Sequence, residues 1–249
     1  MTIFITGATA GFGQATARKF AHDGAKIIGT GRRANRLTEL AQEIGPNFLP
    51  LTFDVGSRKQ VEHAISTLPA EFAAVDVLVN NAGGAIGLDP APTASLDDWD
   101  AMVDSNIRGV MYCTRLLLPG MLERGRGHII NLGSVAGEFP YPGGNVYGAA
   151  KAFVHQFSQN LRADLLGSPI RVTNIEPGLC GGTEFSEVRF KGDKSKAAAV
   201  YEGTQPLTAE DIATAIHWVT TLPPHMNVNV MQLMPVCQAF GPLAVKRSM

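Results

Sequence analysis

Short apolar runs alternate with helical patterns along most of the chain. Residues 2–6, Thr-Ile-Phe-Ile-Thr, are apolar and β-branched, which is typical of a strand buried on both faces. Similar runs cover residues 26–30, 48–53, 75–79 and 128–132, with helical patterns between them. Strands that alternate with helices predict one α/β domain, a doubly wound sheet of about seven parallel strands flanked by helices on both faces.

Tyr147 and Lys151 lie in a segment with apolar residues at helical spacing. Positions i and i+4 share one face of a helix, so the phenol and the ammonium are predicted to lie side by side. A cation within about 4–6 Å lowers the pKa of a phenol, which could then exchange a proton with an alcohol near neutral pH. The alternative is a solvated pair with no catalytic role.

A glycine-rich turn connects the first strand to the first helix, which is predicted at residues 15–22. A strand, a glycine-rich turn and a helix N-terminus form an anion site, because glycines allow close approach of a pyrophosphate. The turn therefore predicts a dinucleotide site, although ordinary turns also need glycine. Its residues are Gly7, Ala8, Thr9, Ala10, Gly11, Phe12 and Gly13.

Arg32 and Arg33 follow the second predicted strand. Many NAD sites have an acidic residue at this point, where it binds the ribose hydroxyls. Two guanidinium groups would instead clamp a 2′-phosphate, so the pair favours NADP. The alternative is that both arginines only begin the surface helix that contains Leu37 and Leu40.

Polar and small residues end the third and fourth predicted strands. Ligands of open α/β sheets bind beyond the carboxyl ends of the strands, so these residues are candidate adenosine contacts. Ordinary turn chemistry is the alternative. The candidates are Asp54, Val55, Asn81, Ala82 and Gly83.

The ordered motifs resemble the short-chain dehydrogenase/reductase family over essentially the whole chain. They are TGATAGFG at residues 6–13, NNAG at 80–83, Asn106, Ser134, YGAAK at 147–151 and Pro177-Gly178. Longer stretches, including TGRR, LPGM and IEPG, are similar to the NADP-dependent 3-hydroxy acid dehydrogenases. That resemblance implies a Rossmann-type fold, with residues 1–130 mainly binding the dinucleotide and residues 131–249 carrying the catalytic residues.

The resemblance also implies roles for individual residues. Tyr147 would be the general acid or base, and Lys151 would lower its pKa and bind the nicotinamide ribose. Ser134 would hold the substrate oxygen, and Asn106 would anchor a water in a proton relay. A helix-capping serine and a tolerated mid-helix asparagine are the alternatives for these last two.

The loop after Pro177-Gly178 departs from the family pattern. The usual threonine position is occupied by Gly182, and Thr183 follows it, so the assignment of Thr183 to the nicotinamide is an expectation across a longer loop. Residues 183–206 correspond to the substrate lid of the family. Arg189, ahead of Lys191, is expected to bind a substrate carboxylate, because a guanidinium matches a carboxylate bidentately. A solvated charged loop is the alternative.

Composition narrows the class of protein. The chain has 249 residues and a net charge of −1, which gives no electrostatic argument for nucleic acid or an anionic membrane as a partner. No apolar run approaches the ~18 residues of a spanning helix. Cys113, Cys180 and Cys237 are widely spaced without a metal or redox motif, which predicts reduced thiols and a cytoplasmic location.

Two long apolar segments, residues 102–122 and 147–166, are similar to the helices that pair across a two-fold axis in the family. They predict a homotetramer, and the tail from Pro235 to Met249, with Phe240, Leu243 and Val245, is expected to reach a neighbour.

The favoured function is oxidation of serine, allo-threonine or 3-hydroxypropionate, or reduction of the matching semialdehydes. The alternatives are a carbonyl reductase of larger neutral substrates, an epimerase-type relative and a non-catalytic NADP-sensing regulator. The presence of both Tyr147 and Lys151 argues against the regulator.

Overall fold

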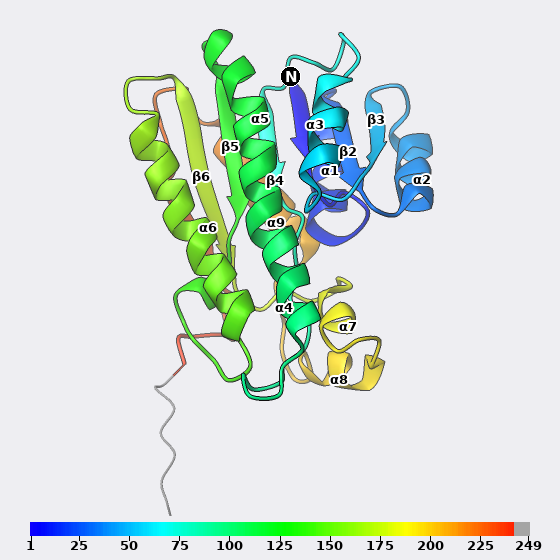
Figure 1. The fold of residues 1–249 in the computed structure, drawn as a ribbon, viewed down its shortest axis with the longest axis vertical. Helices are drawn as coiled ribbons and strands as arrows, with labels where there is room; N and C mark the ends of the chain where they lie inside the picture. Colours follow the sequence, from blue (N-terminus) through cyan, green and yellow to red (C-terminus); the bar gives the residue numbers. More distant parts are fainter. Residues whose placement is uncertain (242–249) are drawn as a thin grey trace, which may run out of the picture.

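Seven strands form one parallel sheet at the centre of the molecule (Figure 1). The computed structural model describes residues 1–241, and the spatial order of the strands is β3-β2-β1-β4-β5-β6-β7. Their bounds are β1 Thr2–Ile5, β2 Lys26–Gly31, β3 Phe48–Thr52, β4 Val77–Asn80, β5 Gly127–Leu132, β6 Ile170–Pro177 and β7 Val230–Leu233. The order reverses between β1 and β4, and the doubly wound fold predicted from the sequence is confirmed.

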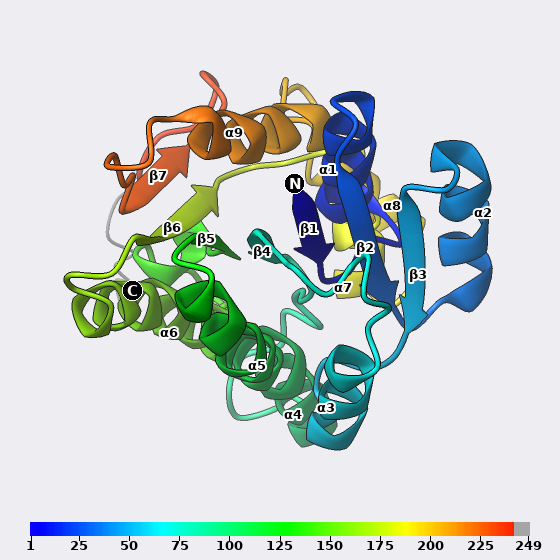
Figure 2. The same ribbon diagram turned by 90° about the horizontal axis from the view of Figure 1, so that it is seen from above.

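Helices cover both faces of the sheet (Figure 2). One face carries α1 (Gly11–His22), α2 (Ala34–Ile44) and α9 (Ala209–Thr221), and the other carries α3 (Arg58–Ser66), α5 (Gly109–Glu123) and α6 (Asn145–Asp164). Helix α4 (Leu96–Val103) leads into α5 through a π-helical turn, Asp104–Arg108. No helix within residues 1–241 has the length and apolar character needed to cross a membrane.

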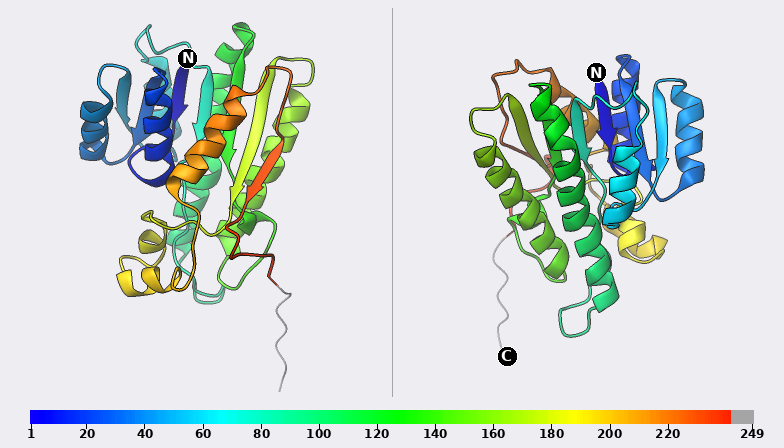
Figure 3. Two further views of the ribbon diagram at one scale, coloured as in Figure 1. Left: turned by 180° about the vertical axis from the view of Figure 1, so that it is seen from behind. Right: turned by 45° about the horizontal axis from the view of Figure 1, so that its top comes forward.

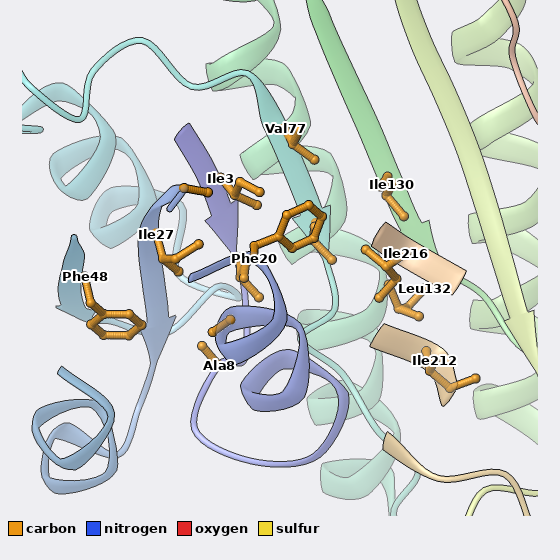
Figure 4. Close-up of a cluster of buried hydrophobic side chains, with 14 of the residues drawn as sticks. Ile3, Ala8, Phe20, Ile27, Phe48, Val77, Ile130, Leu132, Ile212 and Ile216 are labelled. Atoms are coloured by element: carbon orange, nitrogen blue, oxygen red, sulfur yellow. The ribbon is translucent and has the colours of Figure 1, made fainter. Parts of the chain in front are cut away.

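Alternating side chains of each strand enter the two faces. Ile3 of β1 lies in one cluster with Phe20 of α1 and Ile216 of α9 (Figure 4), and Ile5 belongs to the same cluster. Phe4 lies in the cluster on the opposite face. Both faces of β1 are therefore buried, as its uninterrupted apolar sequence predicted. Burial of one such side chain stabilises the fold by roughly 1.5–3 kcal/mol.

The lid lies beyond the carboxyl ends of the strands (Figures 1 and 3). It contains two short helices, α7 (Phe185–Arg189) and α8 (Lys194–Ala199), which the sequence pattern did not predict. Each helix is too short to carry an apolar stripe over several turns, which is the signal that identifies a longer helix.

The described part of the tail contacts its own chain, and the expectation that the tail reaches a neighbour stays a prediction. Gln238 accepts a hydrogen bond from the Leu179 amide at 2.7 Å, and the rings of Phe240 and Phe139 lie 4.4 Å apart. Leu243 and Val245 lie outside the described residues.

Candidate active site

The site residues predicted from the sequence gather at the carboxyl edge of the sheet. This edge receives the end of every parallel strand, so residues that are far apart in the chain become neighbours there. The turn after β1 holds residues 7–13, the turn after β2 holds Arg32 and Arg33, and the loops after β3 and β4 hold residues 54–55 and 81–83. Residues 134 and 177–178 belong to the ends of β5 and β6, and the lid supplies Thr183 and Arg189.

The glycine-rich turn has the shape of a phosphate cradle. Gly7 and Gly11 have φ angles of 70° and 52°, in the left-handed region that side-chain-bearing residues rarely adopt. A Cβ on Gly13 would lie 2.4 Å from the Gly7 carbonyl oxygen, so only glycine permits this close contact between turn and helix. No side chain caps the N-terminus of α1, and its first turn has no acidic residue. The free amides and the helix dipole therefore suit a pyrophosphate.

Arg32 and Arg33 differ in their contacts. Arg33 donates to the Thr9 hydroxyl at 2.9 Å and pairs with the Glu184 carboxylate at 2.8 Å, so it connects the glycine-rich turn to the lid. Arg32 is exposed and has no hydrogen-bonding or ionic partner within residues 1–241. Of the two guanidinium groups, that of Arg32 is the one available to an added phosphate.

The Asn81 side chain holds the glycine-rich turn in place. Its amide donates to the carbonyl oxygens of Thr6 at 2.8 Å and Gly7 at 3.1 Å. Asn81 thus contacts the turn through its side-chain amide, and its backbone amide donates to the Thr6 hydroxyl at 2.9 Å. Asp54 caps its own loop by accepting from the Gly56 amide at 2.9 Å, and Val55 is buried.

Asn106 lies in the π-helical turn. The sequence had suggested a regular α-helix at this position. Its side-chain amide donates to the carbonyl oxygens of Met102 at 2.9 Å and Gly84 at 3.0 Å. Its own oxygen is buried and has no protein donor within the described residues. A π-helical turn often marks a functional position, and here it directs this free oxygen toward Gly83.

Tyr147, Lys151 and Ser134 form the centre of the site. Tyr147 and Lys151 are both buried on α6, and the Lys151 ammonium lies 5.7 Å from the centre of the Tyr147 ring. Lys151 donates to the Leu132 carbonyl oxygen at 2.8 Å, which fixes the ammonium against the end of β5. Ser134 follows this strand, and its hydroxyl accepts from the Ala136 amide at 3.1 Å. The sequence prediction that the phenol and the ammonium share one helix face agrees with this geometry.

Burial shifts the pKa values of both Tyr147 and Lys151. Desolvation raises the pKa of Tyr147 well above its ordinary value, while Ser134 and Arg189 act to lower it. Desolvation also lowers the pKa of Lys151 to about 8. The sequence predicted that Lys151 would lower the pKa of Tyr147. In the cofactor-free protein this expectation is wrong, because loss of water around the phenolate outweighs nearby positive charge.

The loop after β6 meets both the glycine-rich turn and the tail. The Thr183 side chain approaches Gly11, since a Cβ built on that glycine would lie 3.4 Å from Thr183 Cγ2. Gln238 of the tail contacts the Pro177-Gly178 turn and was missed in the sequence, where no pattern connects a distant glutamine to that turn. Thr183 is thus beside the predicted pyrophosphate site despite the longer loop.

Arg189 of the lid reaches the catalytic centre. Its guanidinium carbon lies 6.0 Å from the centre of the Tyr147 ring and 5.1 Å from that of Tyr141. It donates to the Tyr141 hydroxyl at 2.8 Å, and no carboxylate of residues 1–241 pairs with it. Lys191, by contrast, pairs with Asp98 at 2.7 Å. Lys191 is therefore neutralised by an aspartate whereas Arg189 is not, and the contact of Arg189 with a substrate stays a prediction.

The chain belongs to the short-chain dehydrogenase family, whose model matches residues 1–194. It is 58% identical over 248 residues to the NADP-dependent 3-hydroxy acid dehydrogenase YdfG of Salmonella typhimurium, with 100% of both chains covered. It is also 52% identical over 246 residues to the serine 3-dehydrogenase of Rhizobium radiobacter, covering 99% of this chain and 98% of the relative.

Solved structures show the same fold. The closed form of a serine dehydrogenase complexed with NADP+ superposes with a TM-score of 0.98 at 55% identity, and 100% of both chains is covered. The serine dehydrogenase from Escherichia coli gives a TM-score of 0.86 at 50% identity, covering 96% of this chain and 100% of that one.

Proposed function

We propose that this protein is an NADP-dependent oxidoreductase that transfers a hydride between NADP(H) and small 3-hydroxy acids. Serine, allo-threonine and 3-hydroxypropionate, or the corresponding semialdehydes, are the proposed substrates. One observation carries the proposal, namely a guanidinium without an acidic partner beside the Tyr147 phenol. Two relatives, 58% and 52% identical over 100% and 98% of their length, carry the names NADP-dependent 3-hydroxy acid dehydrogenase and serine 3-dehydrogenase.

The residues present fit NADP. The uncapped N-terminus of α1 and the left-handed glycines suit a pyrophosphate, and Arg32 is available to a 2′-phosphate. Tyr147, Lys151 and the Pro177-Gly178 turn would border the nicotinamide half. The bound cofactor would supply the group that accepts or donates the hydride.

Tyr147 would hold or receive the proton of the reacting oxygen. In reduction, the buried phenol is protonated at neutral pH and is ready to donate to the oxygen that gains negative charge. Ser134, whose hydroxyl lies near the phenol, would donate a second hydrogen bond to that oxygen and orient it. The Lys151 ammonium would pass the proton onward to a water that the free Asn106 oxygen would anchor by accepting a hydrogen bond from it.

Arg189 would bind the carboxylate of the substrate. In a 3-hydroxy acid the carboxylate is only two carbon atoms from the reacting carbinol, so one small molecule can span Tyr147 and Arg189. The neighbouring lid cations Lys191 and Lys196 already pair with Asp98 and Asp193. Lys194 has no ionic partner within residues 1–241, but Arg189 is the lid cation whose guanidinium carbon lies 6.0 Å from the centre of the Tyr147 ring, so the geometry favours Arg189 for this contact.

A carbonyl reductase of larger neutral substrates is the second candidate, because the same catalytic residues would serve it. It would not need a cation at this point, and the position of Arg189 argues against it. We further propose that the enzyme is a cytoplasmic homotetramer.

A substrate panel tests the proposal. NADP reduction is measured with L- and D-serine, the four threonine stereoisomers, 3-hydroxypropionate, 3-hydroxyisobutyrate and neutral alcohols of equal size. We expect kcat/KM to be at least roughly ten-fold higher for acids than for their neutral analogues, as one charge-assisted contact allows. Equal or higher values for the neutral alcohols would overturn the proposal in favour of the carbonyl reductase.

A further inference from the structure

Tyr141 makes two separate contacts with Arg189. Its hydroxyl accepts from Nη2 of Arg189 at 2.8 Å, and its ring lies 5.1 Å from the guanidinium carbon. A hydrogen bond and a cation–π contact from one side chain restrict both the position and the plane of the guanidinium. Tyr141 belongs to the loop after β5, 48 residues away in the chain.

The backbone of Gly87 holds Arg189 from a third loop. The Gly87 amide donates to the Arg189 carbonyl oxygen at 2.9 Å, and Nε of Arg189 donates to the Gly87 carbonyl oxygen at 3.4 Å. Gly87 has a φ angle of 73°, a conformation that favours glycine. The lid, the loop after β4 and the loop after β5 therefore all meet at the Arg189 side chain.

These partners leave the charge of Arg189 uncompensated. A phenol and a carbonyl group are neutral acceptors, whereas an aspartate or glutamate at the same place would cancel the positive charge. Within residues 1–241, no protein acceptor is recorded for Nη1. The edge formed by Nη1 and Nη2 therefore keeps free N–H groups, which is the geometry that a carboxylate meets with two parallel bonds.

We infer that Tyr141 is a positioning residue for recognition of acidic substrates, an inference that rests on the proposed function. Tyr141 orients the Arg189 guanidinium toward the reacting centre without neutralising it. Its effect on catalysis passes through Arg189, so it matters for substrates that carry a carboxylate and not for neutral ones.

A double-mutant cycle tests this inference. Kinetics with serine and with a neutral alcohol are compared among wild type, Tyr141→Phe, Arg189→Ala and the double variant. We expect Tyr141→Phe to raise KM for serine roughly ten-fold and Arg189→Ala roughly a hundred-fold, with far smaller changes for the alcohol. Because the two residues act as one unit, the double variant should be no worse than Arg189→Ala alone.

Tyr201, the tyrosine of the lid itself, provides the matched control. The Tyr201 hydroxyl lies 2.6 Å from the Ser186 hydroxyl, and Tyr201 makes no recorded contact with Arg189. Tyr201→Phe removes a hydroxyl from the lid in the same way, and it should leave the ratio of kcat/KM between serine and the alcohol unchanged. An equal change of that ratio in Tyr201→Phe and Tyr141→Phe would overturn the inference, because general loosening of the lid would explain both.

Failure of the inference differs from failure of the proposed function. If wild type prefers acids but the two losses add in the double variant, Tyr141 acts independently of Arg189 and the inference is overturned alone. If wild type shows no preference for acids, the proposed function fails and the inference falls with it.

Discussion

The Tyr147 hydroxyl is the proposed proton donor and acceptor of the reaction. We expect Tyr147→Phe to keep the fold and the affinity for NADP but to lose turnover, because the ring is buried and only the proton donor is removed. General acid–base assistance is worth ~10²–10⁴ in rate. Measurement of kcat together with NADP affinity tests this, and a variant that keeps more than about a tenth of wild-type kcat would exclude Tyr147 as the acid or base.

Titration of Lys151 should make the free energy of unfolding depend on pH. Burial lowers its pKa from 10.5 to about 8, so between these values the unfolded chain binds a proton that the folded protein has released. The free energy of unfolding of the cofactor-free protein should therefore rise as pH increases from about 8 toward 10. Above pH ~10 the raised pKa of Tyr147 acts in the opposite direction.

Urea unfolding at several pH values measures this effect. Lys151→Met removes the titrating group while keeping an apolar chain of similar length, so its stability should be flatter across the same window. Parallel curves for the wild type and the variant would show that Lys151 does not titrate differently on folding.

Residue types at fixed spacing were enough to predict which side chains come together, but not their electrostatics. The YxxxK spacing placed Tyr147 and Lys151 on one face of α6. Desolvation depends on everything packed around a group, including residues from α7 that lie far away in the chain. The direction of the Tyr147 pKa shift could therefore not be derived from its neighbour four residues away.

At the scale of elements, the turn between β2 and α2 should select the cofactor. We expect the double variant Arg32→Ala and Arg33→Ala to weaken NADP at least ten-fold more than NAD, since the lost charge-assisted contact between Arg32 and the 2′-phosphate contributes about 1.5–3 kcal/mol. Arg36→Ala is the control, because Arg36 pairs with Glu39 at 3.6 Å on the exposed side of α2. Equal losses of both cofactors in titrations would show that the two arginines are structural.

Strands β1, β2, β4 and β5 were predictable because nearly all of their residues are buried, which produces short apolar runs. The runs named from the sequence did not include β6 or β7, and the residues of β7 are only half-buried. The π-helical turn that contains Asn106 was not, because it differs from an α-helix by a shift in hydrogen bonding and not by a distinct hydrophobic period. Helices α7 and α8 were missed because their positions follow from packing of the lid on distant loops.

At the scale of the whole molecule, two separate surfaces carry exposed apolar side chains. Helix α5 presents Met111 and Leu122, which are 40% and 42% exposed, and Leu166 in the turn after α6 is 83% exposed. On the other side of the sheet, Trp218 of α9 is 49% exposed, and β7 is the edge strand opposite β3. A tetramer with dihedral symmetry uses two such independent two-fold interfaces.

We expect sedimentation at micromolar concentration to show a homotetramer. Met111→Glu places a charge on the α5 and α6 surface and should yield dimers, while Lys59→Glu on exposed α3 should leave the tetramer intact. A wild-type protein that sediments only as a monomer would contradict the prediction.

The bridge from Thr9 through Arg33 to Glu184 has a consequence for the order of events during turnover. Glu184 and Arg189 lie within one short stretch, which touches the dinucleotide side at one end and the substrate side at the other. A dinucleotide bound beneath this lid segment cannot dissociate while the segment covers it. We therefore expect compulsory-order kinetics, in which the dinucleotide binds first and dissociates last. Product-inhibition patterns measure this order, and release in random order would rule it out. If release limits turnover, kcat should also fall as solvent viscosity increases.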